Sequence, residues 1–278
     1  MGGAMSRLPE SAGTPDSILT LEDAAALFGV SVKTFIKLLR EEDVPARKIG
    51  REWRFSSEAL FRWLGEGRSR QYSDSDQETR RFFDAIATGY DATKDHAFEA
   101  EMLGALAVHC APASGALHLD YGAGTGVIAQ WIAGLQAQVL ALDVSSGMLA
   151  ELNRQAAAKG LSGIATRLCE MGEVPVADAT VSRVYASFSL HHVPEPAQTL
   201  LALRRCMTAD GCLAVVEYVP YQDEAWQESR HDTWPGLSAD AVAQWLREAG
   251  FRQIRKVWEQ QTPEGRQAYL TIARVDAG

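Results

Sequence analysis

An apolar strand that runs directly into a glycine-rich turn is the feature that most constrains what this chain can fold into. Residues 117–119 read Leu-His-Leu, and the run Asp-Tyr-Gly-Ala-Gly-Thr-Gly follows at 120–126. Apolar residues then recur at helical spacing from Val127 to Ile132. Strand, glycine turn and helix in this order are typical of nucleotide-binding α/β sheets, because glycines let the backbone approach a ligand closely. The third glycine comes too early for the GxGxxG pattern of dinucleotide-binding sheets, which disfavours NAD as the ligand.

An acidic residue ends the next predicted strand. The apolar run 139–142 leads into Asp143, about twenty residues after the glycines, where a carboxylate can accept hydrogen bonds from both ribose hydroxyls. The alternative is that Asp143 only begins a helix. Further strand-like runs follow at 183–188, 212–218, 251–258 and 269–275. Because these runs alternate with helical stretches, we expect an α/β fold with a doubly wound, mainly parallel sheet and helices on both faces.

Composition excludes several classes of protein. Of the 278 residues, 46% are hydrophobic and 23% are charged, which is ordinary for a globular chain and argues against wholesale disorder. The sequence has no apolar run of about 18 residues and no basic segment followed by an apolar one, so we expect neither a membrane span nor a secretory signal. The four cysteines are not spaced as CxxC, so we expect no metal site, no disulfide framework and a reducing, cytoplasmic location.

Shifts in composition divide the chain into four parts. We expect a mobile tail over 1–16, a small domain over 17–66, a linker over 67–77 and a large domain over 78–278. The formal net charge of −9 splits into +1 for residues 1–70 and −10 for the remainder. An acidic balance disfavours nucleic acid as a partner, and this argument therefore applies to the large domain alone.

The small domain has the pattern of short helices followed by a β-hairpin. Thr20 is a predicted N-cap, and Gly29 supplies a turn before a second helix over 32–40. Residues 46–55 alternate like two strands, and a further capped helix follows them. Two helices around a glycine turn are typical of helix-turn-helix proteins.

The segment from Ile18 to Leu64 resembles the excisionase/MerR-like winged helix-turn-helix family in this order of elements. The resemblance implies DNA binding, with the second helix toward bases and the hairpin toward phosphates. The implied DNA-binding residues are Lys33, Thr34, Lys37, Arg47, Lys48, Arg51 and Arg54. The alternative is that these charges only solvate a small fold or mediate protein contacts. The acidic run 41–43 repels phosphate, so we expect weak binding by a single copy and a two-fold homodimer that reads paired half-sites.

Four segments of the large domain together resemble the class I S-adenosylmethionine-dependent methyltransferases. They are FFDAIATGYD at 82–91, LDYGAGTG at 119–126, ALDVSSGML at 141–149 and ASFSLHHV at 186–193. Within that family the sequence is similar, from about residue 80 to 276, to the ubiquinone/menaquinone-biosynthesis type, which acts on small molecules. The resemblance implies a Rossmann-like seven-stranded sheet whose last strand is antiparallel. It also implies S-adenosyl-L-methionine as cofactor and S-adenosyl-L-homocysteine as product.

The resemblance also assigns contacts to the cofactor. It places the glycines beside the methionine part, Asp120 at its amino group and Asp143 at the ribose. The implied cofactor-binding residues are Asp120, Gly122, Ala123, Gly124, Gly126, Asp143, Val144, Met148, Glu170, Met171, Ser187 and Phe188. Two positions depart from the family pattern: Glu170 stands where Asp is usual, and Val181-Ser182 stands where Phe-Asp is usual.

Three residues are candidates for the chemistry itself. A cationic sulfur favours aromatic neighbours, which makes Tyr90 a candidate beside the sulfonium, with core packing as the alternative. His191 and His192 follow the fourth strand, and an imidazole could remove a proton from the acceptor. The alternative is that these histidines only pack, while Glu217 and Tyr218 at the end of the next strand contact the substrate.

We expect an enzyme that transfers a methyl group to a small-molecule acceptor, with the small domain fused for docking or regulation. The alternative is a transcription regulator that senses S-adenosylmethionine with little or no turnover. A DNA methyltransferase is disfavoured, because ASFSLHHV lacks the Asn/Asp-Pro-Pro-aromatic sequence used on flipped bases. The acidic large domain also repels a duplex.

Overall fold

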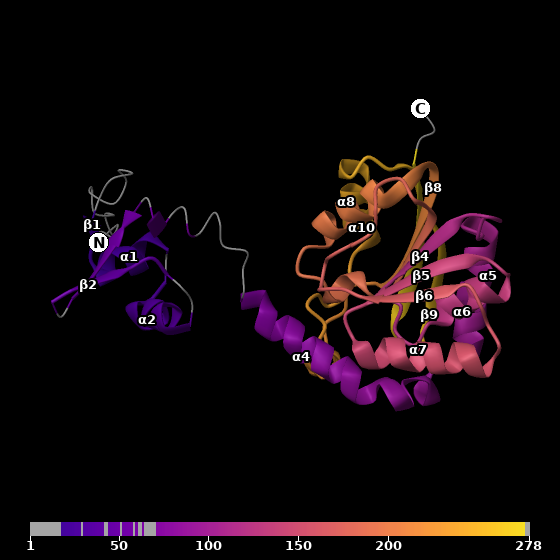
Figure 1. The fold of residues 1–278 in the computed structure, drawn as a ribbon, viewed down its shortest axis with the longest axis horizontal. Helices are drawn as coiled ribbons and strands as arrows, with labels where there is room; N and C mark the ends of the chain where they lie inside the picture. The colour runs from indigo at the N-terminus through magenta and orange to yellow at the C-terminus, as the bar shows by residue number, and fades with distance from the viewer. Residues whose placement is uncertain are drawn as a thin grey trace, which may run out of the picture. The chain divides into compact units, whose positions relative to one another are not determined.

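Figure 1 shows the computed structural model, which describes residues 18–28, 30–41, 44–50, 52–57, 59–60, 63 and 71–275. The chain divides into two compact units, Met1–Gln71 and Tyr72–Gly278. In the described part, no helix combines the length and the apolar character needed to cross a membrane.

The small unit has a three-stranded antiparallel sheet with helices packed on it. Its described elements are β1 (Ile18–Leu19), α1 (Leu21–Leu27), α2 (Val32–Glu41), β2 (Arg47–Ile49) and β3 (Glu52–Ser56). The strand order is β1-β3-β2, so the predicted hairpin is confirmed as β2–β3. Strand β1 was not predicted, because two residues are too few to show an alternating pattern.

Local rules explain how the small unit begins and packs. The Thr20 hydroxyl accepts the N–H of Asp23, and the Asp23 carboxylate accepts the N–H of Thr20, which is a capping box at the start of α1. Phe35 of α2 is fully buried, and its ring centroid lies 5.3 Å from that of Phe55 on β3. Gly29, the predicted turn residue, lies outside the described residues.

The large unit is built on a seven-stranded sheet. Its strands are β4 (Leu117–Tyr121), β5 (Gln138–Asp143), β6 (Ile164–Leu168), β7 (Val181–Ser187), β8 (Met207–Tyr218), β9 (Arg252–Gln261) and β10 (Gln267–Arg274). The order is β6-β5-β4-β7-β8-β10-β9; the neighbours from β6 to β8 pair in parallel, and the last strand, β10, is antiparallel to β8 and β9. The predicted topology is therefore confirmed. Strand β6 was not predicted, because this edge strand is only partly buried and lacks a continuous apolar run.

Helices cover both faces of this sheet. The described helices are α4 (Gln71–Ile86), η1 (Ala87–Thr93), α5 (His96–His109), α6 (Val127–Gly134), α7 (Ser146–Ala158), η2 (Leu190–His192), α8 (Pro196–Cys206), α9 (Glu224–Arg230) and α10 (Ala239–Glu248). Along β5, Val139 and Ala141 face a core shared with α5, α6 and α7, whereas Leu140 and Leu142 face a core shared with α8 and α10. Figure 1 shows α5 and α6 on the opposite side of the strands from α8 and α10.

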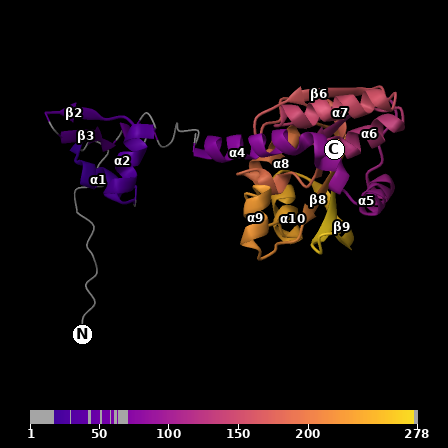
Figure 2. The same ribbon diagram turned by 90° about the horizontal axis from the view of Figure 1, so that it is seen from below.

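Helix α4 begins inside the segment predicted as a linker. Residues 71–77 belong to this helix, while 67–70 lie outside the described residues. A Ser- and Asp-rich run is compatible with the first turns of a helix, because acidic side chains there interact favourably with the helix dipole. The other end of α4 lies beside α7, where the Asp84 carboxylate accepts the Ser145 hydroxyl (2.6 Å) and the N–H of Gly147 (2.8 Å) (Figure 1, Figure 2).

Candidate functional site

A cavity of about 240 Å³ opens where the carboxyl ends of β4, β5, β7 and β8 meet. Parallel strands bind ligands at this edge, because their connecting turns converge there. Most of the predicted cofactor residues line this cavity, namely Asp120, Gly122, Ala123, Gly124, Asp143, Val144, Met148, Met171, Ser187 and Phe188. Tyr90 and His192 line it as well.

The glycine turn has a conformation that other residues adopt only under strain. Gly122, Gly124 and Gly126 have φ values of +66°, +54° and +85°. A Cβ on Gly122 would lie 2.4 Å from the Cβ of Ser189, which is too close for any substituted residue. Gly126 does not line the cavity; it caps the N-terminus of α6 and packs against Leu152. Its role is therefore to set the path of the chain between β4 and α6.

Asp143 joins the glycine turn to the start of α7. Its Oδ2 accepts the N–H of Gly124 at 2.7 Å, and its Oδ1 accepts the N–H of Ser145 at 2.8 Å. The carboxyl group is buried, and this burial raises its pKa although the backbone bonds act in the opposite direction. A buried acceptor at the strand end is suited to neutral hydroxyl donors, as a ribose provides.

Asp120 is a second buried carboxyl group at the same edge. Its Oδ2 accepts the N–H of Ala129 at 3.0 Å, and burial raises its pKa to about 7. The backbone bond and Lys94 act in the opposite direction, while Asp143 adds to the rise. A carboxylate this poorly solvated gains strongly from a cationic partner such as an ammonium group.

Glu170 is, with Gly126, one of two predicted cofactor residues that do not line the cavity. Its side chain is exposed and pairs with Arg80 of α4 at 2.5 Å, outside the cavity lining. The neighbouring Met171 does line the cavity. The adenine contact expected of Glu170 stays a prediction, while this carboxylate pairs with α4 outside the cavity lining.

Phe188 reaches the cavity through an unusual backbone conformation. Its φ of 50° is rare for a bulky residue, and its N–H donates to the carbonyl of Val216 at 2.8 Å. The ring lies 4.5 Å from that of Tyr218 between centroids. Strained residues of this kind cluster at functional sites, where the surrounding structure holds them in place.

Tyr90 lies on η1, and its ring contacts Lys94, a residue that was not among the predicted site residues. The Nζ atom of Lys94 lies 4.9 Å from the centroid of the Tyr90 ring, within the range of a cation–π contact. Burial raises the pKa of the Tyr90 hydroxyl. The electron-rich face of the Tyr90 ring therefore contacts one cation, the Lys94 ammonium group, at the edge of the cavity.

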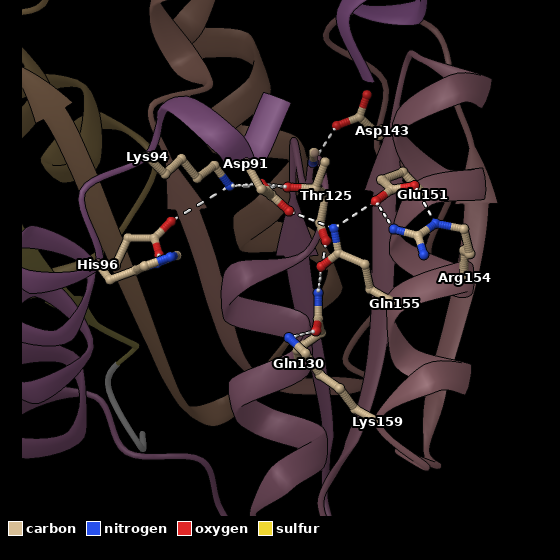
Figure 3. A network of polar contacts seen from close by, with 12 residues as sticks. Asp91, Lys94, His96, Thr125, Gln130, Asp143, Glu151, Arg154, Gln155 and Lys159 are labelled. Carbon is tan, nitrogen blue, oxygen red and sulfur yellow. Dashed lines mark hydrogen bonds and ion pairs between the residues drawn. The ribbon is translucent and has the colours of Figure 1, made fainter. Parts of the chain in front are cut away.

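Hydrogen bonds and an ion pair connect η1 and its C-cap Lys94 to the glycine turn and to α7. Figure 3 shows Asp91 between Thr125 and Gln155: it accepts the Thr125 hydroxyl at 2.6 Å and the Gln155 amide at 2.5 Å. Lys94 lies 2.7 Å from Asp91 and donates to Thr125 at 3.0 Å. Gln155 also donates to Glu151 of α7. Sequence reasoning missed this network, because the bonds that join η1 to Thr125 and Gln155 connect residues 31 or more positions apart in the chain.

His191 sits between two buried carboxylates. Its Nδ1 lies 2.6 Å from Glu217 Oε2, and its Nε2 lies 3.5 Å from Asp232 Oδ1. Burial opposes its charge, but Glu217 and Asp232 together raise the pKa of His191 to about 10. Both nitrogens face carboxylates, and His191 lines the smaller cavity and not the larger one, so its role as a base stays a prediction.

His192 has the opposite electrostatic environment. Burial and the neighbouring His191 charge lower its pKa to about 3. Its Nδ1 lies 3.2 Å from the carbonyl oxygen of His231 and 3.6 Å from Asp232 Oδ1. A second cavity of about 40 Å³ adjoins these groups and is lined by His191, His192 and Asp232 together with aromatic rings. One nitrogen from each histidine and one Asp232 oxygen lie within 4.8 Å of one another, so this group is able to hold a metal ion.

The structure also locates the predicted DNA-binding residues of the small unit. Lys33, Thr34 and Lys37 are exposed on α2, and Arg47, Lys48 and Arg54 lie on the hairpin. Arg51 lies outside the described residues. Arg47 and Arg54 are direct neighbours across β2 and β3, whereas Lys48 pairs with Trp53. Arg54 forms an ion pair with Glu52, so part of the predicted positive charge is already balanced within the hairpin.

Both units match known families of domains. Residues 119–229 match the methyltransferase domain family, and residues 18–68 match a helix-turn-helix domain family. A demethylmenaquinone methyltransferase of Thermobifida fusca (strain YX) is 35% identical over 108 residues, which cover 38% of this chain and 44% of that protein. The enzyme of the same name from Renibacterium salmoninarum is 33% identical over 147 residues, which cover 51% and 59%. The chain thus spans about half the length of the curated relatives it matches.

Solved structures share the fold of the large unit at low sequence identity. An S-adenosylmethionine-dependent methyltransferase from Mesorhizobium loti is 18% identical with a TM-score of 0.53, and the match covers 63% of this chain and 97% of that one. Phospholethanolamine N-methyltransferase 2 from Haemonchus contortus, solved with phosphomonomethylethanolamine and S-adenosylhomocysteine, is 13% identical with a TM-score of 0.61 and coverage of 72% and 61%. The large unit therefore has the Rossmann-like fold of class I methyltransferases.

Proposed function

Because the large unit carries a methyltransferase domain on the class I fold, we propose that this chain transfers the methyl group of S-adenosyl-L-methionine to a small-molecule acceptor. The observation that carries the proposal is one cavity in which the glycine turn, Asp120 and Asp143 meet. The product of the cofactor is S-adenosyl-L-homocysteine. Curated relatives that act on demethylmenaquinone support an acceptor of small-molecule size.

In this proposal, a different group of residues in the cavity binds each part of the cofactor. The turn from Gly122 to Gly126 lets the backbone approach the methionine part, while Asp120 binds its ammonium group and Asp143 the ribose. Tyr90 and His192 border the end of the cavity that takes the acceptor, because both also line the small adjoining cavity. His191 is a positioning residue that ties His192 to Glu217 and Asp232. Methyl transfer is an in-line displacement, so holding donor and acceptor in register contributes much of the rate.

A labelling experiment tests this proposal against a regulator that only senses the cofactor. The chain is incubated with S-adenosyl-L-methionine carrying a labelled methyl group, in one sample with a metabolite extract and in another with duplex DNA. We expect label in a small molecule and none in DNA. Label in neither sample, together with tight cofactor binding in calorimetry, would support the regulator instead.

The Asp120 carboxyl group predicts a pH dependence of cofactor binding. Its pKa of about 7 means that the group is mostly protonated at pH 6 and mostly ionised at pH 8. Only the ionised form attracts an ammonium group, so binding below pH 7 has to release a proton. Affinity for S-adenosyl-L-homocysteine, measured by calorimetry, should therefore rise about tenfold from pH 6 to pH 8. Asp120→Asn should bind weakly and lose this slope; a slope that persists in the variant would assign the titration to another group.

We propose further that the small unit binds DNA through α2 and the β2–β3 hairpin. The support is the helix-turn-helix match over 18–68 and the exposed basic side chains of these elements. Phosphate contacts give such binding its affinity and its sensitivity to salt. Because Glu52 balances part of the charge of Arg54, we expect a single copy to bind DNA with modest affinity. Helix-turn-helix proteins commonly read paired half-sites as two-fold dimers, so we also expect a homodimer on DNA. Light scattering would measure the mass of this complex.

Reversing two charges on the hairpin tests this DNA binding. Arg47 and Arg54 are paired across the strands, so Arg47→Glu with Arg54→Glu turns one continuous basic surface acidic. The affinity for a random-sequence duplex, measured by fluorescence anisotropy at low salt, should fall about tenfold. The control is Arg255→Glu with Lys256→Glu on exposed β9, which changes the net charge equally. An equal loss in both double variants would show that only the overall charge matters.

A further inference from the structure

A group of metal-binding side chains faces the small cavity at the acceptor end of the site. His191 and His192 come from η2, and Asp232 follows α9, so residues about 40 apart in the chain meet there. His191 and Asp232 are buried, and His192 is nearly so. All three line the cavity of about 40 Å³, so the group lies beside open space.

Two of the three separations within this group match those of ligands on one metal ion, and the third, between the two imidazoles, lies within 4.8 Å. The distance from Asp232 Oδ1 to His191 Nε2 is 3.5 Å, and to His192 Nδ1 it is 3.6 Å. Ligands about 2.0–2.1 Å from a tetrahedral metal lie about 3.4 Å from one another. The Nδ1–H of His192 donates to the carbonyl oxygen of His231 at 3.2 Å, and coordination by this nitrogen would release that proton.

Outer groups hold the ligands in the orientation that coordination needs. His191 presents Nε2 because its Nδ1 faces Glu217 Oε2 at 2.6 Å, and that carboxylate is itself anchored by the N–H of Leu190. Asp232 presents Oδ1 because its Oδ2 accepts the hydroxyl of Tyr221 at 2.5 Å. A carboxylate behind a ligating histidine and a hydrogen bond behind a ligating carboxylate are the usual supports of metal sites.

The two ligand-bearing segments are also fixed to each other. The N–H of Trp234 donates to the carbonyl of His191 at 2.9 Å, and the Thr233 hydroxyl donates to the carbonyl of His192 at 2.8 Å. The Trp234 indole donates to the carbonyl of Val193 at 2.9 Å. Three hydrogen bonds therefore hold the segment that carries Asp232 against the segment that carries the two histidines.

We propose that His191, His192 and Asp232 bind a divalent first-row transition-metal ion, with an open coordination position toward the acceptor cavity. Two imidazoles and one carboxylate suit zinc, cobalt, manganese or ferrous iron, and disfavour calcium and magnesium, which prefer oxygen ligands. The guanidinium of Arg230 lines the same cavity, so an anionic oxygen on the metal would also meet a positive group. The role toward an acceptor rests on the proposed function, but metal binding itself does not. The sequence did not indicate this site, because His191-His192 and Asp232 have no local ligand spacing.

Metal titration of the full chain tests the proposal without cofactor or acceptor. After dialysis against a chelator, zinc chloride is titrated by calorimetry, and cobalt chloride is followed by its visible absorption. We expect one ion per chain and a cobalt spectrum without the thiolate charge-transfer band that the buried cysteines would produce. No binding, or a thiolate band, would overturn the proposal.

Variants locate the ion and separate a lost site from a lost fold. His192→Gln and Asp232→Asn should each weaken zinc binding at least about a hundredfold, and Tyr221→Phe, which keeps all three ligands, about tenfold. The control is His96→Gln, whose side chain is 84% exposed and should leave zinc affinity unchanged. Binding of S-adenosyl-L-homocysteine by each variant reports whether the large unit is folded. Equal zinc affinity in a folded His192→Gln variant and in the control would place the ion elsewhere and refute the proposal.

Discussion

Replacing Asp143 with alanine should lower the affinity of the chain for S-adenosyl-L-homocysteine about a hundredfold. Two backbone N–H groups, those of Gly124 and Ser145, lose a charged acceptor in this variant. The loss of these backbone bonds lowers stability, whereas the loss of affinity comes from the proposed ribose contact, and a hydrogen bond to a charged group contributes about 1.5–3 kcal/mol. A hundredfold change corresponds to about 2.8 kcal/mol, so the expected loss lies within this range.

A matched control separates the cofactor contact from loop stability. Asp84 also accepts two hydrogen bonds at the start of α7, but it does not line the cavity. Asp84→Ala should therefore lower stability with a much smaller effect on affinity, while Asp143→Asn should lie between wild type and Asp143→Ala. Calorimetry gives the affinities, and circular dichroism shows whether each variant is folded. Unchanged affinity in Asp143→Ala would contradict the ribose assignment.

The parts of the site that could be predicted are those whose chemistry is local in sequence. A turn with φ values above +50° strongly favours glycine, so Gly122, Gly124 and Gly126 together indicate it without any knowledge of the fold. An acidic residue at a strand end occupies a fixed place in a parallel sheet, which located Asp120 and Asp143 correctly at the cavity. The number of strands and the antiparallel last strand followed from the family resemblance, because alternation of strands and helices alone does not specify them.

The parts that could not be predicted depend on pairing between distant segments. Lys94 and Asp91 have an ordinary helical context, and only the fold places them against Thr125 and Gln155. His191 was a candidate base by residue type, but Glu217, 26 residues away, and the more distant Asp232 determine its charge. Contacts of this kind leave no periodic pattern in the chain, so a single sequence does not contain a signal for them.

Placing a Cβ on Gly126 should destabilise the large unit by about 3 kcal/mol. The new atom would lie 2.4 Å from Leu152 Cδ1 and 2.5 Å from its Cγ. Leu152 is fully buried in the core between α6, α7 and the sheet, so it has little room to move away. Left-handed strain contributes about 1–2 kcal/mol for alanine, and forcing extra volume into a packed core typically adds about 1–3 kcal/mol.

Gly124→Ala is the control that isolates this close approach. Its φ of +54° imposes backbone strain as well, but a Cβ there meets no atom within 4 Å, so we expect a loss of only about 1 kcal/mol. Urea unfolding followed by circular dichroism measures both variants, and equal slopes with different midpoints would attribute the change to stability. Equal losses in the two variants would mean that backbone strain alone explains the glycines. A larger loss at Gly126 would show that the third glycine serves the packing of α6 against α7.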